Sequence, residues 1–190
     1  MRHGLVLTTG IAIFGIVALA TPQFTAAQPR STEAPMEIGT IEIPESVQAE
    51  HEEIHSTLTE ATNAPGQVGV AAKELARVLH PHFVREEQIA LPPLGLLARL
   101  AAGDHLPEAV VSKALSMTTS LRSELPQMLE EHKVIRAAVV KLRLAARADH
   151  ATKYERLAEQ LALHAQTEEQ VLYPAAILVG DIIRSRSRKE

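Results

Sequence analysis

The chain has 190 residues, enough for one domain with a short extension, and a formal net charge of −4 without a strongly basic or acidic block, which argues against nucleic acid as a partner. It has no cysteine, which excludes disulfides, thiolate zinc sites, iron–sulfur clusters and cysteine nucleophiles. Hydrophobic residues make up 46% of the chain and aromatic residues only 3%, so we expect a core of Leu, Val, Ile and Ala between packed helices.

The N-terminus has the pattern of an export signal. Arg2 precedes an apolar run of 16 residues, 5–20, which is shorter than the roughly 20 residues that span a bilayer. Small residues at 18–20 and at 25–27 offer two cleavage sites. We therefore expect residues 1–27 to be a signal peptide and the mature protein to be periplasmic or secreted. The alternative is an uncleaved segment that anchors the protein to the membrane.

Two further segments flank the expected domain. Four prolines lie between Pro22 and Pro44, together with Ser, Thr and Gln, so we expect residues 28–44 to form a linker. The last residues, 184–190, read R-S-R-S-R-K-E and are expected to be a solvated basic tail. Residues 45–183 remain for a single helical domain.

Apolar residues spaced three and four positions apart predict four long helical segments in this domain. Breakers such as Pro65-Gly66 and Gly103-Asp104 separate them. Pro81 and Pro126 lie inside two segments, where we expect a bend, or at Pro126 a restart of the helix. The expected helices cover residues 45–63, 67–90, 107–148 and 151 onward, with a short helix at 94–102.

Each long segment carries a histidine on its apolar stripe, and two of them add a glutamate. A buried carboxylate without a partner is costly, so this set indicates ligands for a metal pair. Imidazole and carboxylate together favour two irons, and without thiolates a structural zinc site is disfavoured. The stripes are Val47-His51-Ile54-Leu58, Leu75-Val78-His82-Glu86-Ile89, Met128-His132-Ile135-Val139-Leu142 and Leu157-Leu161-His164-Glu168-Val171.

The chain consists of two similar halves. The pattern H-x-x-x-E-E-Q-x-x-x-P begins at His82 and again at His164, and the pattern E-H-x-x-I places a histidine at position 51 and another at position 132. The two histidines of a half are 31 residues apart in the first half and 32 in the second. Since residues i and i+4 share a helix face, each half projects an imidazole and a carboxylate in one direction. Two such hairpins close into an antiparallel four-helix bundle with the ligands at its centre.

This doubled pattern, over residues 50–174, resembles the hemerythrin-like family, including its bacterial HHE cation-binding members. The resemblance implies an all-α, up-down-up-down four-helix bundle that holds two non-haem Fe ions, with one carboxylate from each half as a bridge. Carried over by position, the metal ligands would be His51, His82, Glu86, His132, His164 and Glu168.

Four other residues bear on the ligand set. O2-binding members of the family carry H-x-x-x-H on their third helix, where this chain has Arg136. The same pattern occurs here at His51 and His55, so pseudo-two-fold symmetry predicts His55 as a further ligand; the alternative is an ordinary, partly exposed histidine. Glu87 and Glu169 lie about 100° further round their helices, behind the ligands or facing solvent, although some relatives use this carboxylate as the bridge.

The resemblance implies a binding protein that takes up O2 or another small diatomic or oxidant at an open position on one iron. Two alternatives stay open: a di-iron oxidase, peroxidase or nitric-oxide-handling enzyme, and a bundle that holds iron or zinc without O2 chemistry. Ferritin-like oxidases use E-x-x-H twice, and here only Glu52-x-x-His55 fits that pattern. A ferritin-like oxidase is therefore disfavoured.

Overall fold

The structure is a computed structural model that describes residues 40–188. Within this range every regular element is a helix, and none of these helices combines the length and apolarity needed to cross a bilayer. The expected signal peptide, residues 1–27, lies outside the described residues. The elements are α1 (Glu45–Thr62), α2 (Gly66–Ile89), the 3-10 turn η1 (Pro92–Leu96), α3 (Leu97–Ala102), α4 (Glu108–Ala148), α5 (Thr152–Thr167), the π-helical turn η2 (Glu168–Leu172) and α6 (Tyr173–Ser187).

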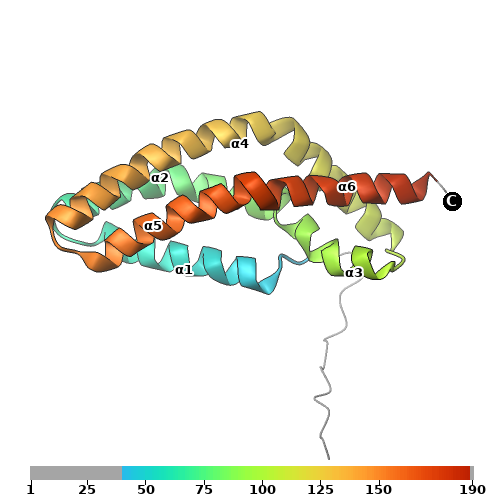
Figure 1. Ribbon diagram of the computed structural model, residues 1–190, viewed down its shortest axis with the longest axis horizontal. Helices are drawn as coiled ribbons and strands as arrows, with labels where there is room; N and C mark the ends of the chain where they lie inside the picture. The colour runs from blue at the N-terminus through green and yellow to red at the C-terminus, as the bar shows by residue number, and fades with distance from the viewer. Residues whose placement is uncertain (1–39, 189–190) are drawn as a thin grey trace, which may run out of the picture. The chain divides into compact units, whose positions relative to one another are not determined.

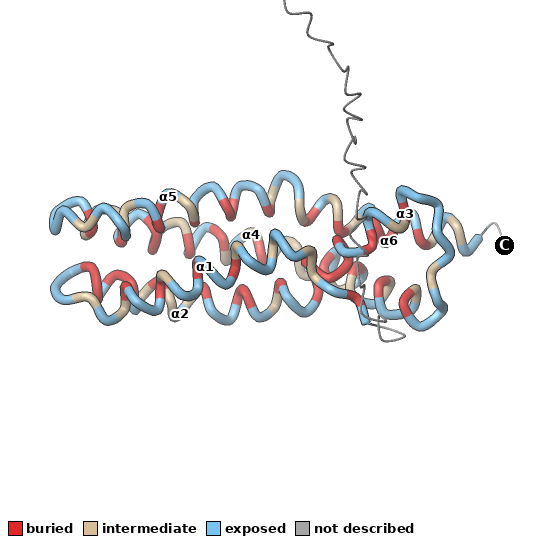
Figure 2. Tube along the Cα trace, turned by 90° about the horizontal axis from the view of Figure 1, so that it is seen from below, coloured by how far each residue is buried: buried red, intermediate tan, exposed pale blue. Residues whose placement is uncertain are grey.

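Four long helices pack side by side around a common interior (Figure 1). Helix α1 contacts α2 and α5, and α4 contacts the same two helices, so the four close into a ring. Helix α6 continues α5 beyond this ring and packs against α4, η1 and α3. Buried residues follow the inward side of each helix (Figure 2), which is the pattern that the apolar spacing predicts.

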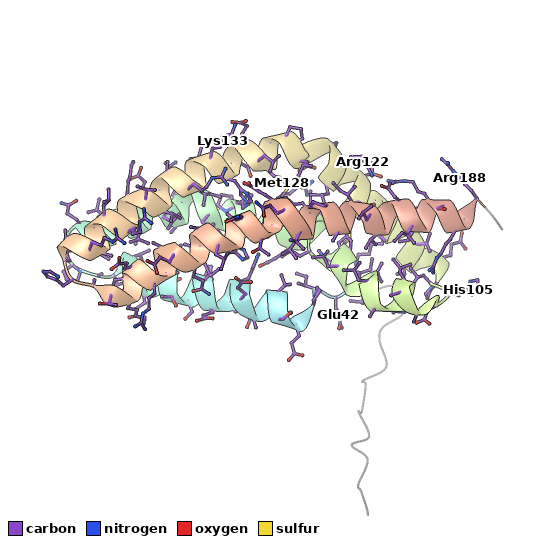
Figure 3. All side chains as sticks on the ribbon, in the orientation of Figure 1. Glu42, His105, Arg122, Met128, Lys133 and Arg188 are labelled. Atoms are coloured by element: carbon purple, nitrogen blue, oxygen red, sulfur yellow. The ribbon has the colours of Figure 1, made fainter. Side chains whose placement is uncertain are left out.

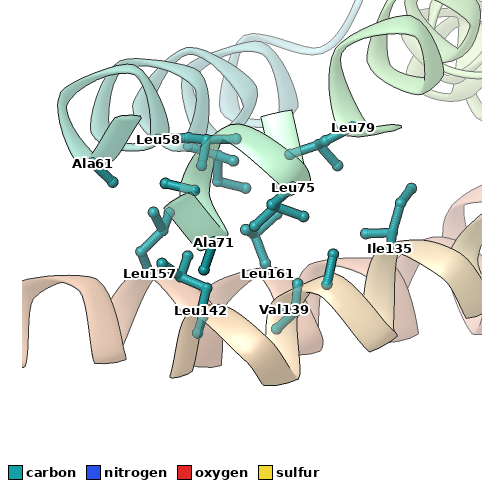
Figure 4. Close-up of a cluster of buried hydrophobic side chains, with 14 of the residues drawn as sticks. Leu58, Ala61, Ala71, Leu75, Leu79, Ile135, Val139, Leu142, Leu157 and Leu161 are labelled. Carbon is teal, nitrogen blue, oxygen red and sulfur yellow. The ribbon is translucent and has the colours of Figure 1, made fainter. Parts of the chain in front are cut away.

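Two apolar clusters bracket the middle of the bundle. The cluster nearest the α1–α2 and α4–α5 connections includes Leu58, Leu75 and Leu142 (Figure 4). A second cluster includes Met128, which is fully buried, whereas Lys133 points outward from the same helix (Figure 3). Each fully buried Leu or Met stabilises the fold by about 1.5–3 kcal/mol. Six of the seven predicted ligands occupy the layer between these clusters, because their positions on each helix fall between those of the cluster residues.

Both internal prolines lie inside continuous helices. Pro81 is within α2 and Pro126 within α4, a single helix of 41 residues. The helix is therefore not restarted at Pro126. Figure 1 shows α4 as an arch, as expected where a proline removes a backbone donor.

The compact domain extends further at both ends than the sequence indicates. Ile41, in the expected linker, is buried in a third apolar cluster with Leu100 of α3. The backbone at Glu42 passes so close to Gly95 that a Cβ there would lie 2.0 Å from the Glu42 carbonyl oxygen. At the other end, α6 continues past Arg184 to Ser187, so the expected tail begins as helix.

The predicted stripe of the last bundle helix is wrong at Val171, which is 55% exposed. The backbone forms a π-helical turn here, in which the N–H of Tyr173 donates to the carbonyl of Glu168, five residues earlier. One additional residue is thereby accommodated in the turn, and the inward face moves from Val171 to Tyr173, which is fully buried. In α2, Val78 of the predicted stripe is half-buried and Leu79 is buried instead.

Candidate metal centre

Six predicted ligands converge in the layer between the two clusters. Helix α1 supplies one histidine, α2 a histidine and a glutamate, α4 one histidine, and the α5–η2 junction a histidine and a glutamate. Every one of them is at most 3% exposed. The residues are His51, His82, Glu86, His132, His164 and Glu168.

Their donor atoms fall into two groups that share both glutamates. Within each group one donor atom from every residue lies within 4.8 Å of the others. We call them the first and the second position. The first position consists of His51, His164, Glu86 and Glu168, and the second of His82, His132, Glu86 and Glu168.

Glu86 turns one carboxylate oxygen to each position. Its Oε1 lies 3.2 Å from Nε2 of His82, and its Oε2 lies 4.0 Å from Nε2 of His51. This is the arrangement by which one carboxylate bridges two metal ions.

Glu168 repeats the arrangement from the opposite side of the layer. Its Oε1 lies 3.0 Å from Nε2 of His164 and 3.6 Å from Nε2 of His51, and its Oε2 lies 3.4 Å from Nε2 of His132. Two carboxylates thus stand between two pairs of imidazoles, and the pseudo-symmetry of the sequence appears as a symmetric donor set.

The donor atoms of the first position have no hydrogen-bond partner. Five buried side-chain nitrogen or oxygen atoms of residues 40–188 are unpartnered, and Nε of Arg143 is the one outside this position. Buried polar atoms are normally hydrogen-bonded, and each exception calls for an explanation such as an ion. The residues present therefore fit a cation. The four atoms are His51 Nε2, His164 Nε2, Glu86 Oε2 and Glu168 Oε1.

Charge interactions within the layer shift several pKa values. Burial lowers the pKa of His82 and of His164, but a nearby carboxylate, Glu86 for His82 and Glu168 for His164, outweighs burial and raises both pKa values to about 9. Burial raises the pKa of Glu86, and the nearby charge of Glu168 raises it further. Burial also raises the pKa of Glu168, but the nearby imidazoles of His132, His164 and His51 outweigh burial and hold the pKa well below its usual range. Protons on imidazoles thus balance carboxylate charge where a cation would otherwise do so.

A second layer of four carboxylates holds the outer edge of the histidines. Each outer glutamate is adjacent in sequence to an inner ligand of its own helix, yet it contacts the histidine of a neighbouring helix. With Nδ1–H donated outward, Nε2 presents its lone pair to the centre, as in other metal sites. The Nδ1–oxygen pairs are His51–Glu87 at 3.3 Å, His82–Glu131 at 2.8 Å, His132–Glu169 at 2.8 Å and His164–Glu50 at 3.2 Å.

All four glutamates of this outer layer can now be compared with the sequence-based expectations. Glu87 and Glu169 contact outer ring edges, as expected of residues behind the ligands, and the structure gives neither of them a bridging place. Glu50 and Glu131 were not identified from the sequence as part of the site. Each directly precedes a histidine ligand in a copy of the pattern E-H-x-x-I, and this repetition could have indicated them. Arg136 forms an ion pair with Glu169, so the residue in place of the family's fifth histidine holds an outer carboxylate.

The structure does not bring His55 to the centre. Its side chain is exposed and lies beside that of exposed His80, with ring centroids 5.8 Å apart. The physical reason is its angle on α1: Ile54 and Leu58 define the buried face with His51, and His55 lies beyond the edge of that face. It belongs to neither group of donor atoms.

Two aromatic residues contact the ligands. Phe83 stacks on His51 with ring centroids 4.0 Å apart. The hydroxyl of Tyr173 donates to Glu86 Oε1 and lies 3.2 Å from Nε2 of His132 and 3.4 Å from Nε2 of His82. Tyr173 is therefore a site residue that the sequence did not reveal, because an unbroken α-helix would place it elsewhere.

Comparison with known proteins gives one result for this region. A family model described as the hemerythrin HHE cation binding domain matches residues 42–176, a range that includes all six converging ligands, the four outer carboxylates and Tyr173. No curated protein and no solved structure matches the chain.

Proposed function

The chain belongs to the hemerythrin HHE cation-binding domain family, and on that premise we propose that its buried centre holds two iron ions and binds O2 or another small oxidant at one of them. The observation that carries the proposal is the pair of glutamates shared by two histidine pairs. Imidazole with carboxylate suits iron, and two shared carboxylates suit a pair of ions. When bound, the metal pair supplies the redox chemistry, and the chain supplies the geometry and the surrounding charge.

The charge around the centre supports a redox-active metal over zinc. Two inner and four outer carboxylates carry six negative charges. Two trivalent ions balance this set, whereas two divalent ions leave an excess of two negative charges. The outer carboxylates are partly exposed and therefore screened, and Arg136 offsets the charge of Glu169. The net negative charge around the centre still favours a metal that can reach a higher oxidation state.

Two further expectations from the sequence, the order of the helices and the location of the protein, become part of this proposal. The bundle would have up-down-up-down order, supported by the short connections at 63–65 and 149–151 and by the closed ring of helix contacts. The protein would act outside the cytoplasm, supported by the export-signal pattern of residues 1–27.

A second candidate is turnover of peroxide or nitric oxide at the same centre. It is favoured by Tyr173, whose buried hydroxyl lies among the ligands and donates to Glu86 Oε1. A binding protein keeps its ligand, whereas an enzyme consumes it, so the two candidates differ in measurable outcome.

The test is the metal content of the purified protein and its absorption spectrum before and after the reduced form meets O2. We expect close to two irons per chain and a new, persistent visible band on aeration. Two irons that oxidise without a persistent band would favour the enzyme. Zinc alone, after attempted anaerobic loading with iron, would contradict both and leave a metal-binding bundle.

A further inference from the structure

Leu91 and Tyr173 are equivalent residues at which the two metal positions differ. Each lies five residues after a shared glutamate and directly before a proline. The N–H of Leu91 donates to the carbonyl of Glu86 at 2.9 Å, and the N–H of Tyr173 donates to the carbonyl of Glu168. Both side chains are fully buried. The same backbone hydrogen bond thus holds both residues, although α2 ends here while α5 continues through η2 into α6, and the two side chains differ.

Tyr173 closes the second position. Its hydroxyl is within hydrogen-bond distance of three donor atoms there, on Glu86, His82 and His132. At the first position the equivalent residue is Leu91, which has no polar atom to offer. All four unpartnered donor atoms of the centre accordingly belong to the first position.

The first position also has a pocket beside it. A pocket of about 730 Å³ is lined by His51, its outer partner Glu87, and Leu91. Of the four residues of the first position, His51 lines this pocket, and Leu91, the counterpart of Tyr173, lines it too. The pocket against His82, at the second position, has a volume of about 490 Å³, and Tyr173 is not among its lining residues.

The two pockets differ in charge. Four carboxylates line the pocket at the first position, and no lysine or arginine is among the described residues that line it. Glu42, which lies just before α1, is one of them (Figure 3); the others are Glu45, Glu52 and Glu87. The pocket at His82 mixes Arg77 and Arg85 with two glutamates. A cleft of one sign repels ligands of that sign and lowers their local concentration.

We propose that an exogenous ligand binds at the first position, between His51 and His164, that Tyr173 excludes it from the second, and that the acidic pocket favours neutral or cationic ligands over anions. This inference rests on the proposed metal centre and states at which of its two positions the ligand binds. Tyr173 acts as a positioning residue, through the space and hydrogen bonds that it occupies. A single ligand per metal pair follows.

The test counts ligands on metal-loaded protein. The protein is loaded with Fe(II) without oxygen, its iron is counted, and nitric oxide, a neutral probe, is titrated to its spectroscopic end point. We expect one nitric oxide per chain for the natural sequence and two for Tyr173→Phe, which keeps the ring and removes the hydroxyl. The reciprocal change Leu91→Tyr should bind none while keeping two irons, and Leu91→Phe separates the effect of the hydroxyl from that of added volume.

The charge of the pocket is tested with azide on the oxidised protein. The double change Glu45→Gln and Glu52→Gln removes two exposed pocket charges without touching a histidine. It should strengthen azide binding about threefold at low salt and leave the nitric oxide count unchanged. Unaltered azide affinity would overturn the charge preference.

The outcomes separate this inference from the proposed function. Fewer than two irons per chain in the natural sequence would contradict the metal centre and this inference with it. Two irons with two nitric oxide molecules in the natural sequence, or with one in Tyr173→Phe, would overturn the inference and leave the centre standing. Should Leu91→Tyr not fold, the Tyr173→Phe count decides alone.

Discussion

Glu131 Oε2 lies 2.8 Å from Nδ1 of His82, a residue 49 positions earlier in the chain. The contact joins α4 to α2 and fixes which ring nitrogen of His82 faces the centre. Burial raises the pKa of Glu131, but hydrogen bonds from His82 and Gln127 outweigh it and lower the pKa overall. The carboxylate is therefore charged at neutral pH and can orient the imidazole.

Glu131→Gln should weaken metal binding without unfolding the bundle. Loss of a carboxylate behind a ligating histidine typically costs 10–100-fold in metal affinity, and we expect a loss of about this size, measured by competition with a chelator. Glu130→Gln is the matched control, because Glu130 is exposed and pairs with Lys133 on the surface. Equal affinities of the two variants would show that the outer carboxylates do not support the centre.

Substitution of an inner ligand should remove metal while the helices remain. His164→Ala takes one of two histidines from the first position, so bound iron should fall from two per chain to one or fewer. Glu168→Ala takes a shared carboxylate and should affect both positions. His80→Ala, on the surface, should keep full occupancy. Metal analysis with far-ultraviolet circular dichroism checks this, and full occupancy in both ligand variants would exclude these residues as ligands.

Metal binding should release protons. The pKa values of His82 and His164 are about 9 without metal, so both imidazoles are protonated at pH 7.5 and must lose a proton to coordinate. We expect at least about two protons released per chain at pH 7.5, measured with an indicator in weak buffer, and an apparent affinity that rises up to about pH 9. Absence of proton release would contradict the pairing of these histidines with the glutamates.

The same two histidines set the pH dependence of the metal-free protein. A folded pKa raised above the unfolded value of about 6.5 adds stability that is complete below pH 6.5 and disappears as the pH rises through 9. The metal-free form should therefore have a lower melting temperature at pH 9.5 than at pH 6.5, while the metal-bound form should change less. If the melting temperature of the metal-free form rises from pH 6.5 to pH 9.5, the predicted pH dependence is wrong.

Substitutions in the bundle core should change the stability of the protein without changing its metal content. Leu142 is fully buried in the cluster near the helix connections, so Leu142→Ala should lower the free energy of unfolding by about 2–5 kcal/mol. Leu144, on the same helix, is exposed, and Leu144→Ala should change the free energy by less than about 0.5 kcal/mol. Denaturant titration measures both, and metal content should stay unchanged in both variants.

The spacing of the sequence predicts the inner ligands because an α-helix repeats its faces regularly. His132 is a clear case: it lies four residues after Met128 and three before Ile135, so it shares their buried face. The doubled pattern adds that both halves contribute alike. Tertiary contacts then decide which of these expectations hold, as the exposed His55 illustrates.

The residues that were missed depend on features that periodicity does not encode. Tyr173 lies five positions after Glu168, which in an α-helix is about 140° away, and only the π-helical turn brings both inward. Glu50 contacts His164 on the neighbouring helix α5, and no single-helix pattern contains such a contact. Both cases involve pairs whose distance is set by helix packing and not by sequence spacing.

The most direct test of the account is to locate the metal in crystals by anomalous diffraction at the iron edge. We predict two peaks per chain, about 3.5–4 Å apart, with Glu86 and Glu168 between them and two histidine Nε2 atoms beside each. A single peak, or iron bound away from the two glutamates, would contradict the dinuclear centre.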